Sequence, residues 1–130
     1  VKFGWAVNND SVPDTEANKF ENYYPGDEYV DYVGVDGFNF NDGEWETWES
    51  VFDDALTRVG RYPKPIFIFS TASAPGPQKA QWISDGFGKQ IKRHRNVIGF
   101  IWFNENKEKD WRINSDPNSL AAFKQVISQW

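Results

Sequence analysis

Amide and carboxylate side chains that lie within a few residues of aromatic residues are the groups in this sequence best suited to chemistry. Three such groups occur: Trp5 with Asn8, Asp36 with Phe38, and Trp102 with Asn104. Aromatic rings stack on the apolar face of a pyranose, and amides and carboxylates hydrogen-bond its hydroxyls. The pattern predicts contacts to a sugar. The alternative is that the rings belong to the core and the asparagines to turns.

A serine, Ser70, ends the apolar run Pro65–Phe69. An unassisted serine hydroxyl is a weak nucleophile and needs an adjacent base. The single histidine, His94, lies in a separate polar run, so no Ser–His pair is predicted. The chain has no cysteine and no glycine-rich dinucleotide motif. We therefore expect neither a metal nor a cofactor.

Four apolar runs are rich in β-branched and aromatic residues. They are Lys2–Val7, Asp31–Phe38, Pro65–Phe69 and Val97–Phe103. None alternates cleanly between polar and apolar positions, which is typical of parallel strands that are buried on both faces. The ends of such strands would bring Asn8, Asp36, Ser70 and Asn104 to one edge of a sheet.

Helical periodicity fills the connections between these runs. The spacing predicts helices over 45–59, with a stop at Gly60, over 77–87, and over 117–127 after an Asp116 cap. The polar first connection holds at most a short helix around Thr15–Asn22. Strands that recur at roughly 30-residue intervals indicate βα units, in an open sheet or part of a (β/α)8 barrel. The 130 residues are expected to form one α/β domain.

Charge and hydropathy exclude two classes of partner. The net charge of −5 argues against nucleic-acid binding, and no apolar run approaches the roughly 20 residues that span a membrane. The charged clusters are expected to be solvated: Lys89, Lys92, Arg93 and Arg95 on one surface, and Glu105, Glu108 and Asp110 with Lys107 and Arg112 in a loop.

Longer stretches of the chain resemble a known family. YYPGDEYVDYVGVDGFNF (23–40), KPIFIFSTASAPGPQKAQWI (64–83), VIGFIWFNENKEKDWRINS (97–115) and FGWAVNNDSVPD (3–14) are similar to glycoside hydrolase family 26, the β-mannanases and related β-glucanases. The first three resemble the regions of its sixth, seventh and eighth strands, and the last resembles the fifth. The resemblance implies a parallel (βα)4 half-barrel over residues 1–130, equivalent to strands 5–8 of a TIM barrel.

The resemblance also implies the state of the catalytic positions. Family members are retaining hydrolases with two glutamates, and the acid/base belongs to strand four, which would precede Val1. The nucleophile belongs where this chain has Ser70, and a supporting tyrosine belongs at Phe38. Trp102 matches an aromatic platform. Retaining cleavage needs two carboxyl groups about 5–5.5 Å apart, so the isolated chain is expected to be inactive.

An isolated half-barrel would have two unpaired edges and an open concave face. Closure by a second copy, giving a homodimer, or by a missing N-terminal half is therefore expected. The implied ligand is a β-linked polysaccharide or oligosaccharide, and the implied location is extracellular or at the cell surface. The alternatives are a non-catalytic carbohydrate-binding module and a purely structural, self-assembling half-barrel.

Overall fold

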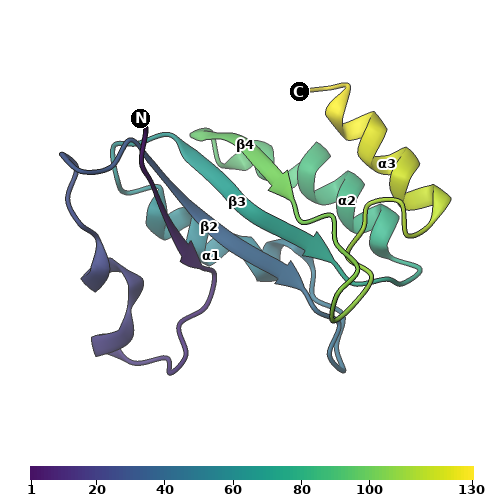
Figure 1. The fold of residues 1–130 in the computed structure, drawn as a ribbon, viewed down its shortest axis with the longest axis horizontal. Helices are drawn as coiled ribbons and strands as arrows, with labels where there is room; N and C mark the ends of the chain where they lie inside the picture. Colours follow the sequence, from purple (N-terminus) through teal and green to yellow (C-terminus); the bar gives the residue numbers. More distant parts are fainter.

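The fold is a four-stranded parallel sheet, described over residues 1–130 by a computed structural model (Figure 1). The strands lie side by side in chain order, β1-β2-β3-β4, and every neighbouring pair is parallel. Their bounds are Gly4–Asn8 (β1), Tyr32–Asn39 (β2), Ile66–Ser73 (β3) and Val97–Trp102 (β4). The predicted α/β half-barrel with four consecutive parallel strands is thus confirmed.

Three α-helices and three short 3-10 helices connect the strands. They are α1 (Trp48–Val59), α2 (Lys79–Gly88), α3 (Pro117–Ile127), η1 (Glu16–Asn18), η2 (Phe20–Tyr23) and η3 (Gln90–Arg93). In Figure 1, α1 and α2 lie behind the sheet, and α3 lies beside α2. None of the helices is both long and apolar enough to cross a membrane.

The helices begin close to their predicted starts, with differences that follow from capping. α1 begins at Trp48, not at Trp45, because the Thr47 hydroxyl caps it by accepting the Ser50 backbone N–H at 3.1 Å. α2 begins at Lys79, two residues after the predicted proline. α3 has the predicted Asp116 cap, whose carboxylate accepts the Ser119 N–H at 2.9 Å.

The first connection contains two 3-10 helices, η1 and η2, in place of a single α-helix. It is fixed to α1 by Arg58, whose guanidinium donates to both carboxylate oxygens of Glu21 at 2.7 and 2.6 Å. The hydrogen bonds from Arg58 lower the pKa of Glu21. The same guanidinium lies 3.9 Å from the ring centroid of buried Phe20. A polar segment is therefore held against the helix layer by one arginine.

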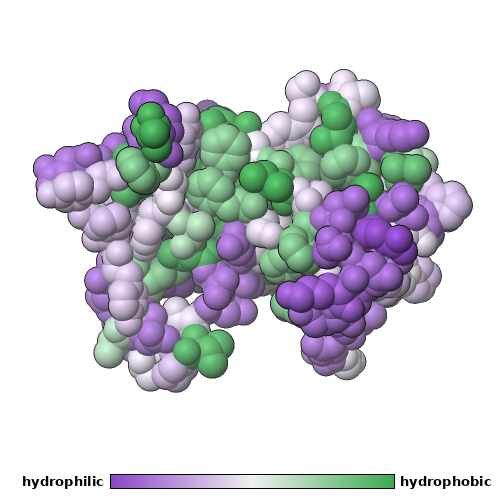
Figure 2. Space-filling model, in the orientation of Figure 1, coloured by the Kyte–Doolittle hydropathy of each residue, from purple (hydrophilic) through white to green (hydrophobic).

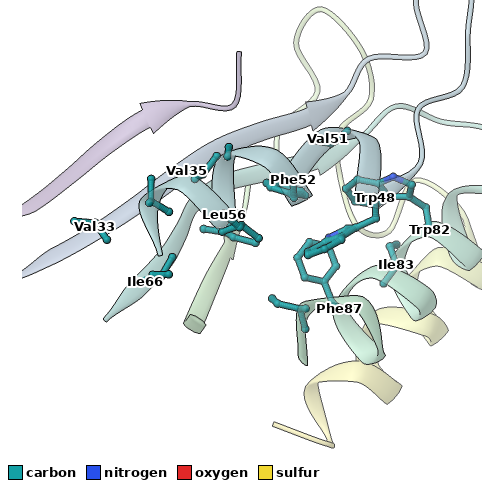
Figure 3. Packing of buried hydrophobic residues seen from close by; sticks show 14 of the residues in the cluster. Val33, Val35, Trp48, Val51, Phe52, Leu56, Ile66, Trp82, Ile83 and Phe87 are labelled. Atoms are coloured by element: carbon teal, nitrogen blue, oxygen red, sulfur yellow. The ribbon is translucent and has the colours of Figure 1, made fainter. Parts of the chain in front are cut away.

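The hydrophobic core lies between the sheet and the helices, on what we call the helix face of the sheet. The strands contribute Val33, Val35, Ile66 and Ile68, all at most 2% exposed, and the helices contribute residues that include Phe52, Leu56, Ile83 and Phe87. Figure 3 shows these side chains converging between α1, α2 and the strands. Both β-branched and aromatic groups are used to fill this layer.

The opposite face of the sheet, which we call the open face, is packed differently. The Phe69 ring covers two glycines: a Cβ added to Gly4 would lie 2.5 Å from it, and one added to Gly34 would lie 2.7 Å from it. Ile98 and Ile101 of β4 are 52% and 54% exposed. Figure 2 shows this face as a continuous hydrophobic area over the central strands. No helix covers it.

Candidate functional site

Three polar residues form a row across neighbouring strands, toward their carboxyl ends. Asn8 is the last residue of β1, whereas Asp36 and Ser70 each lie three residues before the last residue of β2 and β3, because β3 continues to Ser73 and does not end at Phe69 as predicted. Asn8 of β1 pairs with Asp36 of β2, and Asp36 pairs with Ser70 of β3. The Asn9 backbone N–H also donates to the Asp36 carbonyl at 2.9 Å, which extends the β1–β2 pairing beyond the strand end. The sequence predicted that Asn8, Asp36, Ser70 and Asn104 lie at the same end of the sheet. The strand pairing aligns the first three, whereas Asn104 lies in the loop after β4.

A bulge in β3 determines how Ser70 is presented. Val35 pairs with Ile68, whereas the next residue, Asp36, pairs with Ser70, so Phe69 is an extra residue in β3. At a bulge, two consecutive side chains can project from the same face of a strand. Phe69 therefore covers the open face while Ser70 keeps its place in the row beside Asp36.

Asp36 is the one acidic residue within the four strands. Its carboxyl group is half-buried, and its Oδ1 atom is buried without a hydrogen-bond partner. Burial raises the pKa of Asp36, and the Ser70 backbone N–H partly opposes that rise. The group is a half-buried acid in which one buried oxygen has no partner.

An aromatic cluster adjoins the row at the carboxyl end of the open face. The Trp111 ring lies 5.5 Å from Phe38 and 5.3 Å from Phe40, and Phe38 lies 5.9 Å from Phe103, all between centroids. Trp111 is only 2% exposed, although it belongs to the polar loop after β4. Trp111 was not predicted from the sequence, because a single aromatic residue in a charged loop has no periodic pattern.

Trp5 lies away from this row. Its ring packs edge-on against Phe20, Tyr24 and Tyr62 at 6.0, 5.0 and 5.7 Å, beside the main core. Side chains alternate between the two faces of a strand, so Trp5 and Asn8 point to opposite faces. The structure does not bring Trp5 together with the strand-end polar groups.

Trp102 also lies on the helix face. Its ring centroid is 6.4 Å from Trp82, 6.3 Å from Phe87 and 5.9 Å from Phe123, and its Nε1 donates to the Trp111 carbonyl at 2.8 Å. The ring thus helps to join α2, α3 and the loop after β4. Phe103, the next residue, lies with Phe38 instead.

The loop after β4 is held by polar contacts from within the chain. Asn104 accepts the Ile113 backbone N–H through its Oδ1 at 2.7 Å, which closes the loop on itself. Lys79 of α2 is fully buried, and its Nζ donates to the Arg112 carbonyl and the Ser115 hydroxyl, both at 2.9 Å. Burial lowers the pKa of Lys79. These contacts assign Asn104 and Lys79 to positioning the loop that carries Trp111.

Lys107 and Arg112 pair with carboxylates of the same loop, as predicted, whereas Glu105 forms no ion pair and Lys109 pairs with Asp42. Arg112 donates to Asp110 at 2.8 Å, and Lys107 lies 3.4 Å from Glu108. No group of three or more His, Asp or Glu side chains is placed to hold a metal ion. The strand-end site therefore offers one carboxylate, one hydroxyl and one amide beside an aromatic cluster. Such a set can bond sugar hydroxyls, but it does not contain a pair of carboxyl groups.

Two solved structures have a similar fold. A GH113 β-1,4-mannanase superposes with a TM-score of 0.56 at 15% identity, over 96% of this chain and 45% of that chain. A GH128 (subgroup II) endo-β-1,3-glucanase from Sorangium cellulosum gives a TM-score of 0.51 at 15% identity, over 75% of this chain and 41% of that chain. The similarity of fold supports the interpretation of the four parallel strands and their helices as part of a barrel.

Sequence similarity identifies the family. Endoglucanase H of Acetivibrio thermocellus is 39% identical over 133 residues, which cover 98% of this chain and 15% of that protein. The chain therefore spans a small part of this relative's length. The model of glycosyl hydrolase family 26 matches residues 2–112. With identity this high along nearly its whole length, the chain belongs to glycosyl hydrolase family 26.

Proposed function

We propose that this chain is a substrate-binding half of a family 26 barrel for β-linked glucan or mannan and that it does not hydrolyse glycans alone. The observation that carries the proposal is the strand-end row, in which Asp36 is the only carboxylate and Ser70 stands beside it. Retaining cleavage requires two carboxyl groups about 5–5.5 Å apart. A row with one carboxylate supports binding without cleavage.

Ser70 has no histidine beside it to act as a general base. The single histidine, His94, lies near the amino end of β4, where its Nε2 is 3.1 Å from Asp53. Ser70 and the strand ends are at the opposite end of the sheet. We therefore assign Ser70 to the position that the family gives its nucleophile, substituted so that covalent attack is lost.

The proposed sugar contacts come from the open face. Asn8, Asp36 and Ser70 would bond hydroxyls, and Phe38 and Phe103 offer aromatic surface next to them. The names of the relatives, an endoglucanase, a mannanase and a glucanase, support a neutral β-linked glycan as the class of ligand. Because polysaccharides of this kind lie outside cells, we propose extracellular or cell-surface action.

The partner is proposed to be a second half-barrel. β1 and β4 each pair along one side only, and the open face between them is apolar. Either a second copy of this chain or the N-terminal half of a family barrel would pair both edges. Light scattering coupled to size exclusion tests the homodimer: a monodisperse monomer at tens of micromolar would contradict self-closure.

Activity assays test the catalytic part of the proposal. Reducing-sugar release from β-mannan and mixed-linkage β-glucan is expected to be absent for the wild-type chain and for Ser70→Ala, and Ser70→Glu in the same chain should not restore it. Turnover by the wild type that survives Ser70→Ala and is abolished by Asp36→Asn would overturn the proposal.

Affinity electrophoresis in the same two polysaccharides tests binding. Asn8→Ala should reduce the retardation, since Asn8 is exposed at the row. Trp5→Phe provides the matched control on the helix face and should leave the retardation unchanged. If neither polysaccharide retards the wild-type chain, the purely structural half-barrel is the better explanation, and the apolar open face already favours that second candidate.

A further inference from the structure

A groove of about 320 Å³ lies between α1 and α2, on the helix side of the sheet. This is at the low end of the roughly 300–1,000 Å³ range of small-molecule pockets. Its lining residues are Trp45, Thr47, Trp48, Glu49, Gln78, Gln81, Trp82, Asp85 and Gln90. Every one of them belongs to the α1 and α2 region, so the groove does not depend on how the open face is completed.

Three tryptophans give the groove its aromatic surface. Trp48 and Trp82 are 1% and 4% exposed and form part of the helix packing seen in Figure 3. Trp45 precedes α1 and is half-buried, with its six-membered ring against Gly76, where an added Cβ would lie 3.1 Å from Cζ3. The small glycine leaves Trp45 supported on one side and able to offer ring surface to the groove.

Two indole N–H groups at this groove have no acceptor. The Nε1 atoms of Trp48 and Trp82 are buried and unpartnered, whereas those of Trp102 and Trp111 each have an oxygen partner. A buried donor without an acceptor is unfavourable. The two unpartnered donors thus belong to residues that line the same groove, where an oxygen-rich ligand could reach them after a small opening of the helix pair.

The polar groups around the groove are amides, carboxylates and the Thr47 hydroxyl, with no lysine or arginine among them. The Gln81 amide donates to Asp85, and Lys89 lies 3.0 Å from the other Asp85 oxygen. Glu49 forms no ion pair. Two carboxylates disfavour an anionic ligand, and amides beside a flat ring suit a neutral ring that carries hydroxyls.

We propose that the α1–α2 groove is a second glycan-binding site, which takes one or two units of a neutral β-linked oligosaccharide with Trp45 as its stacking surface. The class of ligand rests on the proposed function, but the site itself does not use the strand-end row. The sheet separates the two, since α1 and α2 cover the face opposite to Asp36 and Ser70. The chain would then hold a polysaccharide at two places.

Nuclear magnetic resonance with cellohexaose and mannohexaose tests this site on the intact chain. Addition of the oligosaccharide should shift the indole N–H resonances of Trp48 and Trp82, because they gain an acceptor. Trp45→Ala should weaken binding at the groove by about tenfold or more. Gln78→Ala, at an exposed position whose side chain forms no capping bond, should weaken it less and keeps the test valid if Trp45→Ala is unstable.

The outcomes separate this inference from the proposed function. Shifts of the Trp48 and Trp82 resonances that persist in the Asn8→Ala variant support glycan binding at the groove, even if the resonances of the strand-end residues do not shift. Shifts confined to residues around Asn8 and Asp36 overturn the groove and leave the proposed function standing. No shift at either place with both oligosaccharides overturns the groove and the proposed glycan binding together.

Discussion

The two faces of the sheet differ in how completely other parts of the chain cover them. On the helix face, Val33, Val35 and Ile68 are fully buried beneath α1 and α2. On the open face, Ile98 and Ile101 are more than half exposed, and only the Phe67 and Phe69 rings lie over neighbouring glycines. The helix face is packed against helices in a complete hydrophobic core. The open face has apolar side chains but no second layer packed against them.

This contrast separates the residues that fold the chain from those that meet another molecule. The half-buried Asp36 carboxyl and the polar row lie on the open face, and the aromatic cluster with Trp111 lies at its carboxyl end. The large rings of Trp5, within β1, and Trp102, the last residue of β4, lie on the helix face and hold secondary elements together. Large aromatic size alone therefore does not mark a binding residue here.

The largest expected effect comes from a matched pair of substitutions on the two faces. Phe52→Ala removes a fully buried ring from the helix face and should lower the free energy of unfolding by about 3–5 kcal/mol. Ile101→Thr on the open face should change it by no more than about 0.5 kcal/mol, because the side chain is already exposed. Urea denaturation measures both values. Equal losses would abolish the distinction between the faces.

A smaller loss is expected where the helix layer supports the loop of the open face. Lys79→Met keeps the length of the side chain but leaves the Arg112 carbonyl and the Ser115 hydroxyl without their donor. Release of the buried charge offsets part of the loss, so we expect destabilisation of about 1–3 kcal/mol. Near-ultraviolet circular dichroism should also lose the Trp111 contribution. An unchanged free energy of unfolding would show that Lys79 does not anchor the loop.

The smallest expected change in stability comes from substitution of Asp36, which should stabilise the chain, unlike the substitutions above. Burial raises the pKa of Asp36 in the folded chain, so the folded state binds this proton more tightly than the unfolded state does. The folded state is therefore penalised as the pH rises from the ordinary value of 3.8 through the raised pKa. Asp36→Asn should raise the melting temperature by a few degrees at neutral pH, with a gain that disappears in acid. A gain that is independent of pH would contradict this explanation.

The sequence was sufficient to predict the four strands and the three α-helices, but not the 3-10 helices. Continuous apolar runs gave all four strands, and the Asp116-Pro117 pair gave the start of α3. The start of α1 was predicted three residues early because Trp45 fits the helical period of the residues after it. The local hydrogen bond of Thr47 determines the true start, and periodicity does not report such a bond.

The face of the sheet on which each side chain lies could not be predicted from the same patterns. Strands that are apolar on both faces have no alternation, so nothing in the sequence shows that Trp102 points to the helices and Phe103 to the open face. The extra residue at Phe69 has no mark in the sequence either, since a bulge is a property of the pairing between two strands. Buried Lys79 was missed because its partners are carbonyls of a distant loop.

The agreement between chain order and spatial order has a consequence for how such sheets change by recombination. Each hydrogen-bonded strand pair joins consecutive strands, so no connection crosses an earlier one. A gene cut between two βα repeats would therefore break only one strand pairing and leave the others intact. Fragments of different barrels joined at such a boundary would meet along two seams, one at each edge strand, and the side-chain fit at these seams would decide whether the hybrid folds.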